Sequence, residues 1–594
     1  MAEYLSPGVY VEEFDSGAVP MQGVSTSTAG FLGMAERGPV SGAPELVTSM
    51  ADYRRMFGGY LSAAKYGEGR YMPYAIEQFF INGGSRAYVQ RVVPDDAKAS
   101  AVVAGPMTVS AANPGEWGDL LRVTLSPACK GRTQVFGLNG AELTVKNADG
   151  FAAGDVVEMF DGKTKQYATV NNVTDKVVTL NAPCTLNIVD TKVGSEKYIR
   201  SCEFKMTVAC GDQYEEFNDL SLNASQPNFV GFKTAKSDLI KVTVGAAKPA
   251  AAKPAAKEKK GDDAAAAAAP APAAEPAGDV APFALLGGTD GDLVLALTGG
   301  SDGSPLAASA SVYLGVDNGP GARTGLQGFL ETPDVSLLAA PGVVMPEVQV
   351  ALLGFCENAK SCFAVLDMPG NLKKTKDLAN FRDLYDSTYG AIYHPWIECN
   401  DNLTKRNGYF PPSGAMMGIY ARCDTERGVH KAPANEVVRG CTGLSCPYNQ
   451  AEQDMLNPIG VNLIRAFTGR GIRVWGARTL SSNGLWKYLN VRRLFIYVEQ
   501  SIKVNTNWVV FEPNTEGLWG RVTDTITGFL ATCWRDGALA GGSPSEAFYV
   551  ECSRATMTQD DIDNGRLICQ IGIAPVKPAE FVIFRITQKT SSAG

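Results

Sequence analysis

Histidine is almost absent from this sequence. Only His394 and His430 occur among its 594 residues. Catalytic triads and multi-histidine metal centres both draw on clustered histidines, so this scarcity argues against both kinds of site. The sequence also lacks a G-x-S-x-G nucleophile elbow and a G-x-x-x-x-G-K-[ST] phosphate loop. We therefore expect a protein that is not an enzyme, with no cofactor and no catalytic, cofactor-binding or metal-binding residues.

Three short motifs resemble fragments of known sites, and each is incomplete. Ser62 and Lys65 match the first element of a penicillin-binding-type active site, but no S-D-N triplet follows. The stretch GGTDGD at residues 287–292 resembles one unit of a calcium-binding repeat, and a single copy favours a tight turn. A possible zinc set, Cys423, Cys441 and Cys446 with His430 nearby, lacks a second C-x-x-C pair, so its cysteines are interpreted as core thiols.

The sequence has neither a basic composition nor a long apolar run. Its formal net charge is -8 and its isoelectric point is near 5.2, whereas nucleic-acid-binding proteins concentrate lysine and arginine. No apolar stretch is long enough to span a bilayer, and residues 1–11 lack the basic and apolar regions of a secretory signal. We expect assembly in the cytoplasm, with no nucleic-acid partner and no direct membrane insertion.

The composition is that of a folded protein with several domains. Hydrophobic residues make up 45% and charged residues 20% of a chain that is too long for one hydrophobic core. The thirteen cysteines are odd in number and lack the spacing of a disulfide framework. Their apolar settings, as at Cys356 and Cys533, favour buried free thiols in a reducing compartment.

Two shifts in composition indicate domain boundaries. Residues 246–282 alternate alanine, proline and lysine, which predicts a solvated linker because such a segment buries too little apolar surface to fold. Residues 97–245, upstream of this linker, contain short alternating apolar runs separated by turn signals such as Asn139-Gly140 and Asp161-Gly162. This region is predicted to be an all-β module.

The C-terminal half has the pattern of an α/β (α+β) domain. Residues 335–340 and 362–367 have the composition of buried strands. Four segments have helical patterns: residues 372–385, 452–464, 491–502 and 518–533. In the last segment one apolar stripe contains Leu518, Val522, Ile526, Phe529 and Cys533. Asp560 and Asp561 are expected in the first turn of a helix that begins after Thr558.

Each end of the chain contains an apolar strand with no obvious local partner. The N-terminal strand includes Val9, Tyr10, Val11 and Phe14, and the C-terminal strand, residues 580–586, includes Phe581, Val582, Ile583, Phe584 and Ile586. A strand that is apolar on both faces needs cover on both, and an unpaired strand invites aggregation. Each strand is therefore expected to pair either within its own chain or with a neighbouring copy.

A series of short blocks follows in order along the C-terminal half, between residues 309 and 587: DVSLLAAPG (334–342), YHPW (393–396), PPSG (411–414), IYAR (419–422), GVHKAPAN (428–435), LNPIGVN (456–462), VWGARTL (474–480), NVRRLF (490–495), FEPN (511–514) and PAEF (578–581). In this order the blocks resemble the tail sheath family of contractile phages and related injection systems. The arm-like start YLSPGVYVEE at residues 4–13 and GGSRAYV at residues 83–89 fit the same family.

This resemblance implies a division of the chain into arms, a core and an outer insertion. The implied N-terminal arm is residues 1–20 and the C-terminal strand arm is residues 571–594. The implied sheath core joins residues 21–96 to residues 283–570, so that the α/β core is built with the N-terminal segment. The β-rich insertion at residues 97–245 would lie on the outside of the assembly, and residues 246–282 would be its linker.

The resemblance also implies a structural function and a set of partners. The subunit would polymerise as stacked hexameric rings around an inner tube protein and contract to drive that tube through a target envelope. Baseplate and terminal cap proteins would complete the phage-tail-like particle. The terminal strands would then pair between copies, and Arg521 and Arg535 are candidates for facing the tube. The alternative function is a displayed β-rich binding module without a polymerising role.

Overall fold

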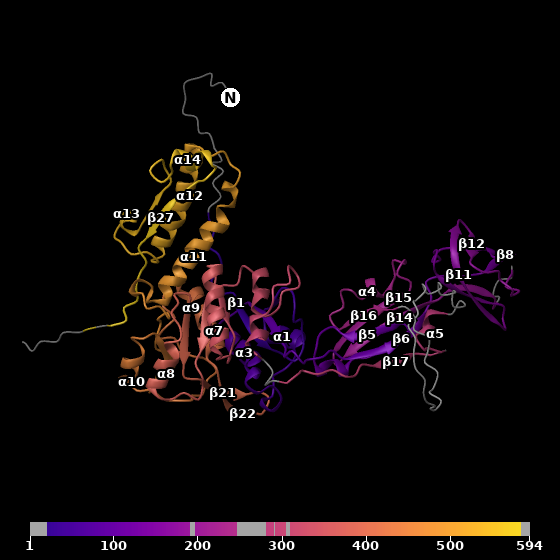
Figure 1. Ribbon diagram of the computed structural model, residues 1–594, viewed down its shortest axis with the longest axis horizontal. Helices are drawn as coiled ribbons and strands as arrows, with labels where there is room; N and C mark the ends of the chain where they lie inside the picture. The colour runs from indigo at the N-terminus through magenta and orange to yellow at the C-terminus, as the bar shows by residue number, and fades with distance from the viewer. Residues whose placement is uncertain are drawn as a thin grey trace, which may run out of the picture. The chain divides into compact units, whose positions relative to one another are not determined.

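The computed structural model describes residues 21–190, 196–245, 281–289, 291–304, 309–581 and 583. These residues divide into two units, each with its own hydrophobic core (Figure 1). The core unit contains residues 21–35, 40–92 and those from 309 onward. The inserted unit contains residues 36–39 and 93–304.

An eight-stranded sheet forms the centre of the core unit. In spatial order its strands are β2 (Glu45–Val47), β3 (Ala87–Val92), β1 (Ala29–Met34), β18 (Leu337–Ala339), β19 (Phe363–Asp367), β20 (Gly390–His394), β24 (Val461–Phe467) and β25 (Gly471–Val474). The strands from β3 to β24 run parallel, and β2 and β25 are antiparallel edge strands. The sheet therefore joins strands that precede the inserted unit to strands that follow it.

Helices cover the apolar strands of this sheet. Every residue of β1, β19 and β20 is buried, as is required of parallel strands covered on both faces. Helices α3 (Met72–Ile81) and α9 (Ser413–Arg427) pack against each other and against the sheet, and α7 (Pro346–Ala359) packs against β19. Gly414 and Gly418 permit the close crossing of α9 and α3, since a Cβ at either position would meet the backbone of α3 within 2.6 Å.

The remaining elements of the core unit lie around this sheet or in its C-terminal region. Those around the sheet are α1 (Met50–Phe57), α2 (Ala63–Tyr66), α6 (Ala310–Leu314), α8 (Thr375–Arg382), α10 (Gln450–Leu456), β21 (Ile397–Asp401), β22 (Arg406–Phe410) and β23 (Gly443–Leu444). The C-terminal region contains α11 (Leu489–Asn505), α12 (Glu516–Arg535), α13 (Pro544–Ala547), β26 (Phe548–Glu551), α14 (Gln559–Asp563) and β27 (Gln570–Ile573). The last two strands form a two-stranded antiparallel sheet that packs with α11 and α12 around a separate apolar cluster (Figure 1).

The inserted unit is rich in β structure and contains two apolar clusters. One cluster lies between a four-stranded sheet, β15 (Gln213–Leu220), β14 (Glu203–Cys210), β6 (Arg122–Ala128) and β17 (Leu293–Ala296), and a three-stranded sheet, β16 (Ile240–Val244), β5 (Met107–Ala111) and β4 (Ala101–Ala104). The other belongs to a seven-stranded sheet, β7 (Arg132–Thr133), β13 (Tyr198–Ser201), β10 (Val156–Phe160), β11 (Lys165–Thr174), β12 (Val177–Leu180), β9 (Glu142–Val145) and β8 (Val135–Asn139). The described part of this unit also contains the short α-helices α4 (Val230–Lys233) and α5 (Pro282–Leu285) and the 3-10 helix η2 (Glu116–Leu120).

The structure confirms the mixed α/β class and several of the predicted elements. Strands β18 and β19 and helices α8, α11 and α12 lie at the segments where they were predicted. All five residues of the predicted stripe on α12 are buried. Thr558 caps α14 through a reciprocal pair of hydrogen bonds with Asp561. All thirteen cysteines lie in the described part of the chain as free thiols.

Two expectations differ from the structure. The helix predicted at residues 452–464 is α10 followed by strand β24, because the chain turns at Gly460, which has a φ of 88°. The core was expected to resume at residue 283, but residues 282–304 belong to the inserted unit. There Phe283 is buried in its apolar cluster and β17 pairs with β6, contacts that local composition does not reveal.

A buried carboxylate joins the end of β19 to the start of α9. Asp367 is 1% exposed and accepts hydrogen bonds from the Ser413 backbone (2.8 Å), the Ser413 hydroxyl (2.6 Å) and the Gly342 backbone (3.0 Å). Burial raises the pKa of Asp367 to about 6, although the hydrogen bonds from Ser413 and Gly342 oppose this rise. Its contribution to stability is therefore greatest below the unfolded pKa of about 4 and is lost as the pH rises through 6.

We predict that Asp367→Asn removes this pH dependence. Between pH 4 and pH 7 the free energy of unfolding of the unmodified chain should fall by about 2 kcal/mol relative to that of the variant. Urea unfolding at several pH values measures the difference, with the exposed Asp377→Asn as the control. Parallel pH profiles for Asp367→Asn and the unmodified chain would contradict the assignment.

Candidate functional site

Both terminal segments of the described chain are fastened to helix α11. The N-terminal segment, residues 22–26, contacts Asn505, the last residue of α11, and Arg493 in the second turn of the same helix. The C-terminal segment, residues 576–580, contacts Asn490 and the N-cap residue Tyr488. Because α11 contains 17 residues, it spans about 25 Å between its ends. We call these two attachments the N-terminal root and the C-terminal root.

Polar side chains of α11 hold the backbone of the N-terminal root. The Asn505 side chain accepts from the Gln22 N–H (3.3 Å) and donates to the Gln22 carbonyl (2.8 Å). The Ser501 hydroxyl accepts from the Val24 N–H at 3.1 Å. Gly23 lies so close to Tyr497 that a Cβ would meet the phenolic oxygen at 1.9 Å. Any larger residue at this position would displace the Tyr497 side chain.

A buried ion pair fixes the inner end of the N-terminal root. The side chains of Arg493 and Asp424 are 3% and 5% exposed, and they form a two-pronged ion pair. The Thr26 hydroxyl donates to Asp424 at 2.7 Å, and Arg493 donates to the Thr26 carbonyl at 2.9 Å. Burial alone would lower the pKa of Arg493, but the charge and hydrogen bonds of Asp424 raise it above its ordinary value. The guanidinium of Arg493 therefore stays charged inside the fold.

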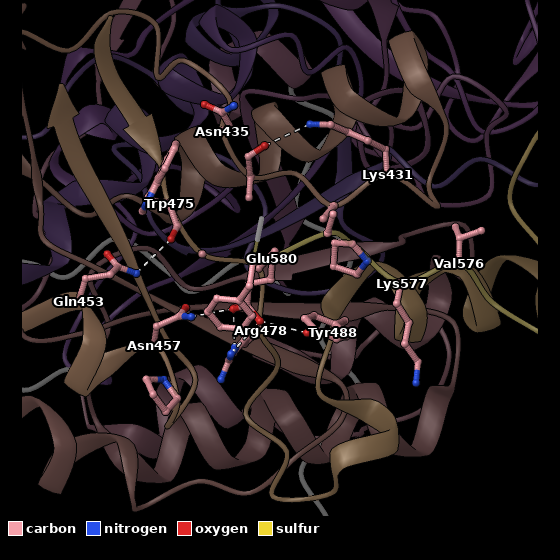
Figure 2. A pocket seen from close by; sticks show the side chains of 18 of the residues that line it. Lys431, Asn435, Gln453, Asn457, Trp475, Arg478, Tyr488, Val576, Lys577 and Glu580 are labelled. Carbon is pink, nitrogen blue, oxygen red and sulfur yellow. Dashed lines mark hydrogen bonds and ion pairs between the residues drawn. The ribbon is translucent and has the colours of Figure 1, made fainter. Parts of the chain in front are cut away.

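Glu580 is the anchor of the C-terminal root. Its two carboxylate oxygens accept from Nε and Nη2 of Arg478, both at 2.8 Å (Figure 2). Further hydrogen bonds come from Asn457 (2.7 Å) and Tyr488 (3.0 Å), and the Lys487 ammonium lies 3.8 Å away. The carboxylate thus receives donors from Asn457 at the C-terminal end of α10, from Arg478, and from Lys487 and Tyr488 just before α11.

The electrostatics of Glu580 favour its ionised form. Burial would raise its pKa, but hydrogen bonds from Arg478 and Asn457 and the Arg478 charge lower it below the ordinary range. A lowered pKa means that the attachment stabilises the fold above the unfolded value of about 4.3 and weakens as the pH falls below it. Beyond this anchor the described residues are exposed: Phe581 is 71% and Ile583 is 79% exposed.

A cavity of about 820 Å³ lies beside the C-terminal root. Its walls come from the end of α9, from α10 and from residues 576–581, and Trp475 and Ala477 line it as well (Figure 2). The cavity contains His430 but no cluster of potential catalytic groups. Within the described ranges, no three His, Cys, Asp or Glu side chains converge as a metal site.

The hairpin of β26 and β27 has an unpaired edge on each strand. The two strands pair with each other over four residues, from Phe548 opposite Ile573 to Glu551 opposite Gln570. Neither strand has another neighbour in the described part of the chain. Unpaired edges expose backbone donors and acceptors that can accept an added strand.

The terminal strand residues predicted from the sequence lie mostly outside the described residues. This holds for Val9, Tyr10, Val11, Phe14, Val582, Phe584 and Ile586. Glu580, Phe581 and Ile583 are described, and none of them is in a strand of the single chain. Their pairing therefore stays a prediction. Sequence patterns missed the roots themselves, although Arg478 and Glu580 fall within the VWGARTL and PAEF blocks.

The two arginines predicted to face a tube lie on α12 and are not brought together. Arg521 pairs with Glu512 at 3.3 Å, and its guanidinium lies 5.2 Å from the centre of the Trp508 ring. Arg535, in the last turn, is hydrogen-bonded to Ala531 and Thr532 of its own helix.

His394, one of the two histidines, is buried beside Tyr448. Burial lowers the pKa of His394 to about 4. None of the described helices is long and apolar enough to cross a membrane.

Comparison with known proteins identifies the relatives of this chain. The phage tail sheath protein central domain matches residues 317–480, and the phage tail sheath C-terminal domain matches residues 481–589. The tail sheath protein of Escherichia phage P2 is 27% identical over 317 residues, which cover 49% of this chain and 74% of that protein.

Solved structures include two further similar chains. A chain of the anti-feeding prophage baseplate is 34% identical, covering 46% of this chain and 78% of that chain, with a TM-score of 0.40. The contracted sheath complex of an extracellular contractile injection system, PVC, has a similar fold over 99% of both chains, with 19% identity and a TM-score of 0.51.

We predict that Glu580→Ala releases the C-terminal root. The Arg478 side chain is 6% exposed, and leaving such a charge without its partner costs about 3 kcal/mol. Amide exchange of residues 574–581 should therefore become about a hundredfold faster, while exchange in the central sheet stays unchanged. Hydrogen-exchange mass spectrometry measures both regions. The exposed Glu426→Ala is the control, and equal exchange in the two variants would contradict the role of Glu580.

Proposed function

The chain belongs to the family of contractile tail sheath proteins, and we propose that its terminal segments join neighbouring copies by adding strands to the β26–β27 hairpin. The observation that carries this proposal is the pair of open hairpin edges. An added strand forms main-chain hydrogen bonds along such an edge. The roots on α11 would transmit a pull on either terminal segment to the rest of the core unit.

We propose that the polymer consists of stacked hexameric rings around an inner tube. A heterologous contact that does not close on itself generates an open helical assembly. Baseplate and terminal cap proteins would bind the two ends of this assembly. Arg521 and Arg535 on α12 are proposed to face the tube, and Arg535 has no acidic partner within the described residues. Assembly in the cytoplasm would precede incorporation into a phage-tail-like particle.

Contraction would follow from the same connections. A contracted lattice that buries more surface between subunits has the lower free energy, so the extended sheath would be kinetically trapped. Strands donated at the hairpin would keep copies joined while their core units rotate. The function is structural, and the proposal includes no catalytic step.

The alternative function accounts for less of the chain. A displayed β-rich binding module without a polymerising role would use the inserted unit alone. The two sheath family matches at residues 317–480 and 481–589 both lie in sequence beyond that unit. A sheath subunit that carries an additional β-rich unit is therefore favoured.

We predict that deletion of residues 2–14 leaves a soluble subunit that does not form tubes. The deletion removes Val9, Tyr10, Val11 and Phe14, which are the proposed donated strand. Negative-stain electron microscopy of each chain, expressed alone and with its genomic neighbours, measures tube formation. The unmodified chain should form hollow tubes with stacked sixfold rings.

A second deletion provides the control. Removal of residues 246–280, an alanine-, proline- and lysine-rich segment, should leave tube formation intact. Normal tubes from the chain that lacks residues 2–14 would contradict strand donation at the N-terminus. Dispersed particles from the unmodified chain under every condition would contradict the sheath function itself.

A further inference from the structure

The cavity beside the C-terminal root has the size and lining of a binding site. Its volume of about 820 Å³ falls in the usual range of ligand pockets, about 300–1,000 Å³. Trp475, Ala477 and Val576 provide apolar surface. Such a cavity accommodates an extended peptide segment with at least one large side chain.

Two polar side chains of α10 and its C-terminal end contribute to the lining of the cavity. Gln453 is 4% exposed, and its amide nitrogen donates to the Trp475 carbonyl at 3.1 Å, which fixes the orientation of the amide. The nitrogen of Asn457 donates to Glu580. The carbonyl oxygens of both side chains are buried and do not open onto the cavity. The polar contacts that the cavity offers to an occupant therefore come mainly from its charged side chains.

The charges that line the cavity favour an acidic occupant. Four basic side chains line it, Arg427, Lys431, Arg478 and Lys577, against the acidic Asp454 and Glu580. Arg478 is neutralised by Glu580, and Lys431 is paired with Glu436. Arg427 and Lys577 are exposed and form no ion pair within the described ranges. The mouth of the cavity therefore carries a positive charge.

The two ends of this chain differ in charge, and only one of them is complementary. Residues 1–20 contain Glu3, Glu12, Glu13 and Asp15 and no lysine or arginine. Residues 584–594 contain Arg585 and Lys589 and no acidic side chain. Glu3 is the one acidic side chain within residues 1–8, and residues 584–594 have none, so charge complementarity favours the N-terminal segment over the C-terminal one. Within it, Tyr4 and Leu5 provide a large apolar surface and a hydroxyl donor.

We propose that the N-terminal tip of a second copy, residues 1–8, binds in this cavity. This inference rests on the proposed strand donation and specifies where the donated segment continues. Strand β27 leads directly into residues 574–581: Ala574 donates to the Ala547 carbonyl (2.8 Å) and Val576 to the Ala538 carbonyl (3.3 Å). The open edge of β27 thus continues to the wall of the cavity.

This continuity fixes the direction of the donated strand. If residues 9–14 pair antiparallel to β27, the residues that precede them run towards Glu580 and the cavity. Eight extended residues span about 26 Å, which matches the seven residue steps from Ile573 to Glu580. Parallel pairing would carry the tip away from the cavity. The proposal therefore requires antiparallel pairing.

Photo-crosslinking in assembled sheaths tests the occupant. Benzoylphenylalanine is introduced in place of Lys577, and sheaths are assembled from an equal mixture of ¹⁵N-labelled and unlabelled subunits. Mass spectrometry should find crosslinks from position 577 to residues 1–8, with about half of them joining a labelled to an unlabelled subunit, as random mixing requires. The same replacement of the exposed Lys376, on α8, is the control and should not crosslink to residues 1–8.

Several outcomes would overturn the proposal. Crosslinks confined to one isotopic label would assign the cavity to the chain's own N-terminal segment. Crosslinks to residues 584–594 or to the tube protein would identify another occupant, and tubes without any crosslink from position 577 would show an empty cavity. In all of these outcomes tubes form, so the proposed sheath function stands while this inference fails.

Reversal of the charges at the cavity provides an independent test. The double variant Arg427→Glu, Lys577→Glu should raise the subunit concentration needed for assembly by about tenfold, because it opposes the acidic segment. Adding Glu3→Lys to this double variant should recover part of the loss. Lys376→Glu is the matched control and should assemble normally. Unchanged assembly of the double variant, or no recovery with Glu3→Lys, would contradict the charge pairing.

Discussion

Helix α11 sets the distance between the two points at which the terminal segments leave the core unit. Its Ser501 and Asn505 hold the backbone of residues 22–24, and its Asn490 and N-cap Tyr488 hold the C-terminal root. A 17-residue helix resists extension because every turn is hydrogen-bonded, so force applied to one root reaches the other with little change in length.

The two roots are built from different interactions, which gives them different sensitivities. At the N-terminal root the Arg493–Asp424 pair is almost fully buried, and replacing one partner would leave an uncompensated charge inside the fold. At the C-terminal root Glu580 is partly exposed and accepts from several donors. Because the pKa of Glu580 is lowered, this root is most stable while the Glu580 carboxylate is ionised, and acid weakens the attachment.

Sequence patterns predicted the elements that bury a regular apolar face. Strand β19 and helix α12 were visible because burial repeats with a fixed period along a continuous segment. The roots were not predicted, because Arg478 and Glu580 are 102 residues apart and Arg493 and Asp424 are 69 apart. No periodicity links such partners. Strand β24 was mistaken for a helix because its short apolar run, Val461, Leu463 and Ile464, directly follows the helical pattern of α10, and short apolar runs do not distinguish the two structures.

The connections of the inserted unit explain how a core sheet accommodates more than 200 residues of additional chain. Both connections belong to one hydrogen-bonded pair of strands: Lys98 donates to the Ser301 carbonyl at 2.9 Å, and Ala101 donates to the Thr298 carbonyl at 3.0 Å. The Asp96 carboxylate accepts from the Ser304 N–H at 2.9 Å. Because the chain leaves and returns along paired segments, the strands on either side of the insertion, β3 and β18, still pair with β1 in one sheet. The pairing of the core strands therefore does not depend on how many residues the insertion contains. The inserted unit is free to differ in length and fold from that of other sheath proteins.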